Sequence, residues 1–264
     1  MSESNPQASR ALAPRRHDEI LKRVAADGSV SIADLARFFD VSRETIRRDL
    51  KILADKGQFE LIHGGAARLD AVEPGLSERA RENARGKAEI GKLAAALVKP
   101  DMVVFLDSGT TTLAVAHALG ALRQPLTVCT SSLAIALFMC HLPNVRVHIL
   151  GGEINPDEEA ASGMDVLQAA EAFRIDIAFL GGGAVTPEGD VTDFTKAGSV
   201  LRSRMLALVQ KAYFVIDSSK FGRSTPLRIA DSHIAAAIVT DQKPGDILFD
   251  ILTDKGIGLI FPLE

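Results

Sequence analysis

Apolar residues recur at helical spacing along the first part of this chain. Ile20, Leu21 and Val24 fall on one face of a predicted helix over residues 15–26, and the Asp27-Gly28 pair that follows is a helix-ending signal. This spacing predicts a helix with one buried face, followed at once by a turn.

Two more helices are predicted directly after this turn. Ser31 is placed to cap the second helix, Asp40-Val41 forms a tight turn, and Ser42 opens a third helix that Gly57 ends. A helix, a shorter helix, a tight turn and a longer helix, in this order, make the helix-turn-helix arrangement. The inward positions are Ile32, Leu35, Ala36 and Phe39 in the second helix and Ile46, Leu50 and Leu53 in the third.

The third helix carries its cations on the face opposite its apolar stripe. An arginine guanidinium can hold a guanine edge or a phosphate with two donors, and a threonine can contact a base edge or a thymine methyl group. We expect the start of the helix to approach bases, with Arg48 and Lys51 nearer the phosphate backbone. The alternative is a solvated face that binds nothing. The candidate DNA contacts are Ser42, Arg43, Thr45, Arg47, Arg48 and Lys51.

Residues 58–62 alternate between polar and apolar side chains, as a half-buried strand does. They lead into His63-Gly64-Gly65, so we predict a β-wing whose tip enters a minor groove, with His63 as a further DNA contact. An ordinary turn position is the alternative for His63. Three helices and a wing together predict a module that binds double-stranded operator DNA.

From about residue 100 onward, short apolar runs alternate with helical stretches. Residues 77–97 form a helical stretch before them, after a polar segment in which Pro74-Gly75 is the expected hinge. Buried strands separated by helices predict a mostly parallel α/β sheet covered on both faces. The predicted strands are 102–106, 126–130, 145–150, 176–180, 213–217, 236–240 and 258–261, and the helices between them include 113–119, 132–141, 165–173 and 200–210.

Small and hydroxylated residues follow five of these predicted strands. In open α/β sheets the carboxyl ends of the strands meet at one edge, where ligands bind. Hydroxyls and glycine amides at helix starts favour an anion there, and Lys220 adds a full positive charge. The sequence therefore predicts a pocket for a small phosphorylated sugar. Its candidate residues are Asp107, Ser108, Gly109, Thr110, Thr111, Thr112, Thr130, Ser131, Ser132, Gly151, Gly152, Gly181, Gly182 and Lys220.

Parts of this pocket also have a plainer interpretation. Gly151-Gly152 alone is more typical of a turn, and Thr130-Ser131-Ser132 is equally well explained as a helix cap. Three consecutive threonines from Thr110 are poor helix formers unless their hydroxyls have a task. Because five strand ends share one edge, we favour the pocket.

The net charge of −4 gives no sign of a nucleic-acid partner, but the distribution of charge does. The first 68 residues hold 12 Lys and Arg against 10 Asp and Glu, and the remaining residues hold 18 against 24. A basic N-terminal part on an acidic body is typical of a separate nucleic-acid-binding module. No apolar run is long enough to span a membrane and no apolar leader is present, so a cytoplasmic protein without membrane contact is expected.

Two cysteines, Cys129 and Cys140, are too few for a disulfide framework or a cysteine-built zinc site, and both are expected to be buried. The histidines do not have the spacing of a metal site. We expect neither a metal nor a cofactor.

Several short motifs of the chain form a recognisable set. In the N-terminal part they are Arg15-Arg16, Ser31-Ile32-Ala33-Asp34-Leu35-Ala36, the run from Val41 to Leu50, and His63-Gly64-Gly65-Ala66. In the body they are Glu78-Arg79 with Asn83 and Lys87, Asp107-Ser108-Gly109-Thr110-Thr111, and Asp217-Ser218-Ser219-Lys220-Phe221-Gly222. With these motifs the chain resembles the DeoR family of transcriptional regulators over roughly residues 15–222 and beyond.

The resemblance implies a winged helix that reads DNA and an effector domain similar to ribose-5-phosphate isomerase. Members of the family are mostly repressors of sugar or nucleoside catabolic genes, relieved by phosphorylated intermediates and generally oligomeric, so a homo-oligomer is expected. Two departures from the family pattern leave the effector open. Thr130-Ser131-Ser132 stands where Thr-Asn-Ser is usual, and Glu153 to Glu159 follows Gly151-Gly152 where an arginine is common.

The predicted organisation is a disordered arm (1–13), a winged helix-turn-helix domain (14–67), a linker (68–76) and an effector-binding and oligomerisation domain (77–264). The predicted function is a sequence-specific repressor of sugar catabolic genes, controlled by a phosphorylated sugar. A sugar-phosphate isomerase fused to a DNA-binding domain is the alternative, and a body that is only an oligomerisation scaffold is a third hypothesis. Isomerases of the similar fold carry two carboxylates where this chain has Ala184-Val185, so catalysis is not expected.

Overall fold

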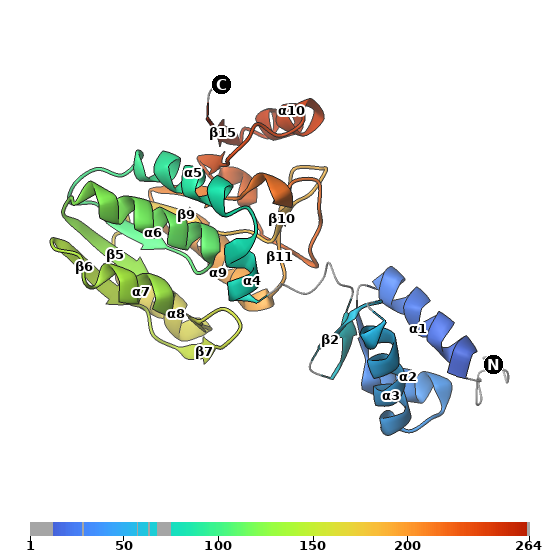
Figure 1. Ribbon diagram of the computed structural model, residues 1–264. Helices are drawn as coiled ribbons and strands as arrows, with labels where there is room; N and C mark the ends of the chain where they lie inside the picture. Colours follow the sequence, from blue (N-terminus) through green and yellow to red (C-terminus); the bar gives the residue numbers. More distant parts are fainter. Residues whose placement is uncertain (1–12, 28, 57, 63, 68–74, 263–264) are drawn as a thin grey trace. The chain divides into compact units, whose positions relative to one another are not determined.

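The computed structural model describes residues 13–27, 29–56, 58–62, 64–67 and 75–262. The chain divides into two units, Met1–Glu73 and Pro74–Glu264 (Figure 1). Most of the expected arm and linker lies outside the described residues, as do Gly28, Gly57 and His63. Within the described part of the chain, no helix has the length and apolar character needed to cross a bilayer.

The first unit combines three helices with a small antiparallel sheet whose strand order is β1-β3-β2. The apolar stripes predicted for the helices meet in one core, which Phe59 and Ala66 complete. The helices are α1 (Ala13–Asp27), α2 (Ile32–Phe39) and α3 (Arg43–Asp55), and the strands are β1 (Ser29–Ser31), β2 (Glu60–Ile62) and β3 (Gly65–Ala67).

The predicted caps define the turn between the two central helices. The Ser31 hydroxyl accepts hydrogen bonds from two amides at the start of α2, and the Ser42 hydroxyl accepts one from the Thr45 amide at 3.1 Å. Asp40 ends α2 in the left-handed conformation, with φ of 52°. The helix-turn-helix predicted from the sequence is therefore present, with its caps in place.

The wing contains a strand that the sequence analysis did not predict. β3 pairs with β2 on one side and with β1 on the other. Gly65 is required at this place, because a Cβ atom on it would lie only 1.9 Å from the Val30 carbonyl oxygen. Phe59, 1% exposed, anchors the start of the wing in the helical core.

The second unit is built on a seven-stranded sheet whose strand order is β15-β14-β12-β9-β4-β5-β6. All of its pairings are parallel, and all seven predicted strands take part in it. Strand ends differ from the prediction by one or two residues. The strands are β4 (Val103–Leu106), β5 (Leu126–Thr130), β6 (Val145–Ile149), β9 (Ile177–Leu180), β12 (Lys211–Val215), β14 (Ala237–Val239) and β15 (Gly258–Ile260).

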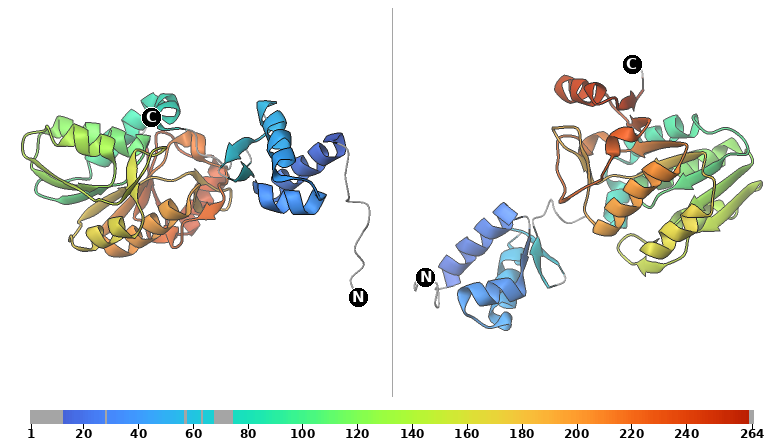
Figure 2. Two further views of the ribbon diagram at one scale, coloured as in Figure 1. Left: turned by 90° about the horizontal axis from the view of Figure 1, so that it is seen from below. Right: turned by 180° about the vertical axis from the view of Figure 1, so that it is seen from behind.

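Helices cover both faces of this sheet (Figures 1 and 2). Side chains of α5, α6 and α7 pack on one face, against Val104 and Val128. Those of α8 and α9 pack on the other, against Phe105 and Phe214. The helices are α4 (Leu76–Arg81), α5 (Ala84–Ala95), α6 (Thr110–Leu122), α7 (Leu133–Met139), α8 (Met164–Glu171), α9 (Lys196–Leu208) and α10 (Asp246–Asp254).

Smaller elements lie around the carboxyl ends of the strands, and the sequence analysis did not predict them. They are the hairpin of β7 (Glu153–Asn155) and β8 (Ala160–Ser162), and a three-stranded sheet of β10 (Ala184–Val185), β11 (Val191–Asp193) and β13 (Leu227–Arg228). Two 3₁₀ turns, Ser218–Lys220 and Ser232–Ile234, follow β12 and β13. Strands of two or three residues are too short to carry a recognisable alternation of polar and apolar positions.

Two predictions for this unit are wrong. The helical stretch over residues 77–97 is broken, because Asn83 takes φ of 44° and caps α5 by accepting a hydrogen bond from the Gly86 amide. Cys129 is buried as predicted, whereas Cys140 is exposed. The run from Leu133 to Cys140 is apolar throughout, but only Ile135 and Met139 of α7 are buried.

Candidate DNA-binding helix and effector site

The two faces of α3 differ sharply in exposure. Ile46 and Leu50 are fully buried, whereas the side chains of Arg47 and Arg48 are 62% and 76% exposed. Both arginines lie near one carboxylate, with Arg47 at 3.4 Å and Arg48 at 3.9 Å from Glu44. Such exposed pairs contribute little stability, so both guanidinium groups are available to an anionic partner.

The other predicted DNA contacts are less uniform. Arg43 and Lys51 are exposed on the same helix. Ser42 and Thr45 already have a structural task, since Ser42 caps α3 and its hydroxyl lies 2.9 Å from the Thr45 hydroxyl. His63 lies outside the described residues.

A buried ion pair fixes α3 against α1, and the sequence analysis missed it. Asp49 is 4% exposed and accepts two hydrogen bonds from Arg16, at 2.5 and 3.1 Å. The His17 ring lies 2.9 Å from the same carboxylate. Bidentate pairs of this kind hold their partners in a fixed orientation, so Asp49 sets how α3 presents its exposed face.

In the second unit, the strand order reverses between β4 and β9. β5 and β6 lie beyond β4, whereas β12, β14 and β15 lie beyond β9. In open α/β sheets, ligands bind outside the carboxyl ends of the strands at such a reversal. Asp107 follows β4 and Gly181 follows β9, so these two of the predicted effector residues lie at the reversal.

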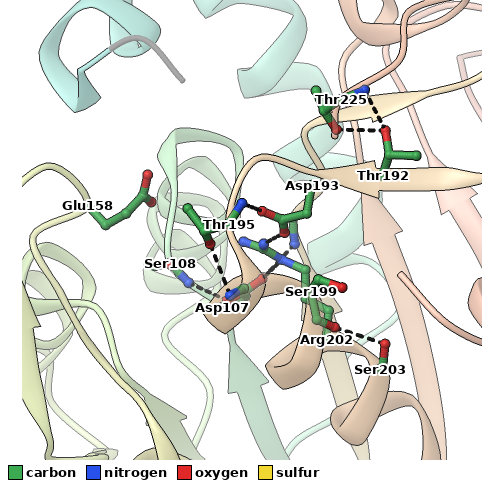
Figure 3. A network of polar contacts seen from close by, with 12 residues as sticks. Asp107, Ser108, Glu158, Thr192, Asp193, Thr195, Ser199, Arg202, Ser203 and Thr225 are labelled. Atoms are coloured by element: carbon green, nitrogen blue, oxygen red, sulfur yellow. Dashed lines mark hydrogen bonds and ion pairs between the residues drawn. The ribbon is translucent and has the colours of Figure 1, made fainter. Parts of the chain in front are cut away.

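Asp107, however, is used inside the protein. Its fully buried carboxylate accepts hydrogen bonds from the Ser108 amide at 2.8 Å, the Gly181 amide at 2.9 Å and the Arg202 Nε at 2.7 Å. Arg202, from α9, also pairs with Asp193 at the end of β11 (Figure 3). Arg202 therefore ties α9 to the ends of β4 and β11, and it was not among the predicted site residues.

The start of α6 has the features of an anion-binding site. Gly109 is its N-cap, with φ of 127°, and no side chain caps the helix. The Thr112 hydroxyl donates to the Gly109 carbonyl and is buried. Within the described part of the chain, the hydroxyls of Ser108, Thr110 and Thr111 make no hydrogen bond. The first amides of the helix and three hydroxyls thus remain available together.

At the end of β5, two of the three predicted hydroxyls have structural partners. Thr130 accepts from the Ser132 amide at 3.1 Å, and Ser132 caps α7 through the Ile135 amide. Ser131 differs from them: its hydroxyl is buried and has no hydrogen-bond partner among the described residues. A buried hydroxyl without a partner is costly, so Ser131 is the residue here that calls for a ligand.

Two of the predicted glycines serve the packing of the fold. A Cβ atom on Gly152 would lie 2.7 Å from the Ser162 carbonyl oxygen at the base of the β7–β8 hairpin. One on Gly182 would lie 2.9 Å from side chains of Val191 and Ile216. Gly151 is exposed, and a Cβ atom on Gly181 would make only ordinary contacts with Asp107 and Arg202.

Lys220 lies at the end of β12 in a cluster of charges. Asp217 and Asp241 both accept hydrogen bonds from the Asn83 amide group, at 3.3 and 3.0 Å. Lys87 of α5 is 4% exposed, and its burial lowers its pKa; Asp217 opposes this effect, and the nearby charges of Lys220 and Arg79 add to it. The half-buried Lys220 is thus the more accessible of the two amines.

A separate cavity of about 510 Å³ lies beside the small sheet. Its lining includes Asp190, Arg228 and Lys255, and both cations pair with Asp190. None of the predicted effector residues lines this cavity.

Two protein-family models match this chain. The DeoR-like helix-turn-helix domain matches residues 16–72, and the DeoR C terminal sensor domain matches residues 82–242. The chain belongs to the DeoR family. The predicted DNA-binding transcriptional regulator is thereby confirmed, and so is the predicted fold class, a winged helix-turn-helix followed by a mostly parallel α/β sheet.

Relatives match over almost the whole chain. The glycerol-3-phosphate regulon repressor of Escherichia coli is 31% identical over 93% of this chain and 97% of its own length. The transcriptional repressor CsqR of the same species is 29% identical over 94% and 95%. The transcriptional regulator IolR of Bacillus subtilis is 28% identical over 92% and 97%. All three are named as regulators of transcription.

The solved structures that resemble this DeoR-family chain are distant. Ribose 5-phosphate isomerase A of Methanocaldococcus jannaschii is 18% identical, with a TM-score of 0.38 over 53% of this chain and 55% of its own. The tetrameric eIF2B-beta2-delta2 complex of C. thermophilum is 13% identical, with a TM-score of 0.46 over 92% and 88%.

Proposed function

We propose that this chain represses sugar catabolic genes and that a phosphorylated sugar, bound at the carboxyl ends of the strands, releases it from operator DNA. The observation that carries this proposal is the start of α6. Its N-cap is a glycine without a capping side chain, and the hydroxyls of Ser108, Thr110 and Thr111 are unused in the described part of the chain. Free amides, the helix dipole and hydroxyl donors together favour a phosphate group.

The distance to Lys220 suits a short ligand. β12 is two strands away from β4 in the sheet, and neighbouring strands are about 4.8 Å apart. The end of β12 therefore lies roughly 10 Å from the end of β4 across the sheet. A small phosphorylated sugar can place its phosphate on α6 and remain within reach of Lys220, with the buried Ser131 hydroxyl as a partner for one of its oxygens.

Fewer residues contact the effector directly than the sequence predicted. We assign direct contacts to Ser108, Thr110, Thr111, Ser131 and Lys220, because their side-chain polar groups have no hydrogen-bond partner among the described residues. Asp107, Thr112, Thr130 and Ser132 are used by the protein itself, and Gly109 supplies the turn that exposes the α6 amides. Close packing leaves no room for a side chain at Gly152 and Gly182, whereas Gly151 and Gly181 have no such restriction.

For the DNA, we propose that the exposed face of α3 enters the major groove. Arg43 and Arg47 would contact bases or phosphates near its start, and Arg48 and Lys51 would contact the phosphate backbone. Binding to a two-fold operator needs two such modules, so the working form is a homo-oligomer. The names of the relatives support the metabolic role, since one is a glycerol-3-phosphate regulon repressor. A repressor that binds operator DNA must be located where the chromosome is, which agrees with the expected cytoplasmic location.

We propose that the chain is not an enzyme. The positions at which the similar isomerases carry two carboxylates hold Ala184 and Val185, and both are fully buried in β10. A general base must lie within hydrogen-bonding reach of the proton that it removes, and neither residue has a group to do so.

Thermal denaturation with a panel of sugar phosphates tests the effector site. Suitable probes are glucose 6-phosphate, fructose 1-phosphate, ribose 5-phosphate and glycerol 3-phosphate, each beside its unphosphorylated form. A ligand that binds the native state raises the stability by RT ln(1 + [L]/Kd). We expect a shift with at least one phosphorylated compound, and its loss in Lys220→Ala.

The matched control is Lys211→Ala, since Lys211 is an exposed lysine at the opposite end of the same strand. It should retain the shift. No shift with any of the four phosphates would contradict the proposal, and turnover of one of them would restore the isomerase hypothesis. In parallel, the purified protein should bind duplexes from its own promoter region at low salt and release them with the active phosphate.

A further inference from the structure

The helix α4 is held to the body by charge rather than by apolar burial. It has only six residues, which is far too short for a helix to be stable on its own. Arg79 is its one buried side chain, at 7% exposure. The Arg79 guanidinium donates to Glu158 Oε1 at 2.8 Å, and the Glu158 side chain is only 18% exposed. The Arg79–Glu158 ion pair is therefore one of the contacts that hold α4 in place.

On one side, α4 is connected to the Lys220 end of the effector site. The Lys87 ammonium donates to the Arg79 carbonyl, and Lys87 is close enough to Asp217 and Lys220 for their charges to act on its pKa. Two residues beyond α4, Asn83 donates to Asp217 and Asp241 at the ends of β12 and β14.

On the other side, Glu158 is connected to the Ser131 end of the site. It lies in the turn of the β7–β8 hairpin, which is fastened to the end of β5 by two backbone hydrogen bonds. The Ala161 amide donates to the Ser131 carbonyl and the Leu133 amide to the Glu159 carbonyl, both at 2.9 Å. Figure 3 draws Glu158 together with Asp107 and Ser108. Arg79 thus joins the two flanks of the proposed effector site.

We propose that the Arg79–Glu158 ion pair is the switch through which the effector site controls the DNA-binding module. This inference rests on the proposed function. In the free protein, Glu158 holds Arg79 and with it α4. A phosphate dianion at the start of α6, the helix against which α4 packs, competes with the Glu158 carboxylate for the Arg79 guanidinium and so releases α4 from the hairpin.

The release of α4 affects the DNA-binding module because of the place of α4 in the chain. α4 is the first element of the second unit, so a displacement of α4 shifts the point at which this unit joins the chain of the DNA-binding module. An apolar anchor would be indifferent to an arriving anion. An ionic anchor with low exposure responds strongly, because charges interact more strongly where water is largely excluded.

The test is Glu158→Gln in the full chain, a change that keeps the size of the side chain and removes its charge. If the ion pair is the switch, this variant has α4 already released. Its operator affinity without ligand should match that of the wild type with the active sugar phosphate, and adding the phosphate should change it less than 2-fold. The phosphate should also bind the variant more tightly than the wild type, because it no longer competes with the Glu158 carboxylate; the gain should lie in the usual range of allosteric coupling, roughly 5- to 150-fold.

The tighter phosphate binding separates the switch from a merely structural role, because a damaged fold does not bind its ligand better. Hydrogen exchange gives a second readout: the amides of residues 76–81 should exchange faster in the wild type with phosphate, and equally fast in the variant without it. Glu158→Asp, which keeps the charge, should fall between the two, and it carries the test if the glutamine variant folds poorly.

Glu171→Gln is the matched control, since Glu171 forms an exposed pair with Arg204 at 3.0 Å in the same unit. It should respond like the wild type. A Glu158→Gln variant with normal phosphate affinity and a normal operator response would overturn this inference alone. A wild-type chain that ignores all four sugar phosphates would overturn the proposed function and the switch together.

Discussion

The exposed face of α3 and the strand ends of the second unit use their charged residues in opposite ways. On α3, Arg47 and Arg48 stand on the exposed face and share only a loose contact with Glu44. At the strand ends of the second unit, Asp107 and Asp193 are buried, and both are bonded to Arg202, whose side chain is 11% exposed. The first arrangement leaves charge available to a large anionic partner, whereas the second consumes charge to hold loops in place.

This difference separates residues that are available to bind a partner from residues that hold other parts of the protein in position. A cation that keeps its water can exchange it for phosphate at little cost. A charge that has lost its water depends on its partner, and removal of that partner is expensive. The four predictions that follow test whether this division holds, beginning with the residue on which most other groups depend.

Arg202→Ala should have the largest effect. It leaves the carboxylates of Asp107 and Asp193 buried without their guanidinium, and breaking a buried ion pair in this way costs about 3–5 kcal/mol. Urea denaturation of the full chain measures the loss. The Cys129 thiol offers a local probe, because it is fully buried and burial raises its pKa to about 11, so it reacts only when the second unit opens.

Arg204→Ala is the control for this prediction, two residues along the same helix. Arg204 is 56% exposed and pairs with Glu171 on the surface. Its loss should cost below about 1 kcal/mol. Equal costs for the two arginines would show that the buried network does not position the strand ends.

Arg47→Ala should leave stability unchanged and weaken operator binding. A lost arginine contact to a base costs about 1–3 kcal/mol of binding free energy, and a lost phosphate contact lowers the salt slope by about 1. Fluorescence anisotropy with an operator duplex at several salt concentrations measures both. Arg204→Ala again serves as the control, as an exposed arginine in the other unit. An unchanged affinity would remove Arg47 from the DNA contacts.

Ser31→Ala should destabilise the first unit by about 1 kcal/mol, because the amides of Ala33 and Asp34 lose the hydroxyl that caps α2. The thermal unfolding of the first unit measures this loss. The reactivity of the Cys129 thiol, in the second unit, should not change. If Cys129 lost its protection at the same time, the two units would unfold together, and the prediction that Ser31→Ala destabilises the first unit alone would be wrong.

Asp241→Asn should have the smallest effect, seen as a weaker dependence of stability on pH. Burial would raise the pKa of Asp241, but hydrogen bonds from Asn83 and Ser218 outweigh it and hold the pKa below its ordinary value. Stability from this group is therefore present above the unfolded pKa of about 3.9 and is lost as the pH falls through the folded value. Urea midpoints at pH 6 and pH 3 should differ less in the variant, and identical differences would contradict the prediction.

Periodicity was sufficient to predict most of the regular structure. The stripes of α1, α2 and α3, the two serine caps and all seven strands of the main sheet follow from the spacing of apolar residues. The exposed face of α3 was predictable for the same reason, since cations off the apolar stripe must face water. The short strands and the hairpin were not predictable, because their position depends on contacts made by the rest of the fold.

The burial of Asp49 and of the Arg202 side chain can be predicted from their positions along the helices. Asp49 lies on the same stripe as Ile46, Leu50 and Leu53, and Arg202 lies on the stripe of Ser199 and Met205. A charged residue at an inward position must find a buried partner. The helical pattern can therefore flag such a residue, but it cannot name the partner: Arg202 and Asp107 are separated by 95 positions in the sequence.

The clamp on Asp49 also limits how far the protein can be trimmed. Its partners, Arg16 and His17, sit within the first turns of α1, well before the helix that meets DNA. A shortened version starting at residue 18 would retain all of α3 but leave the Asp49 carboxylate buried without its two partners. A fusion protein that uses this winged helix-turn-helix unit should therefore include all of α1.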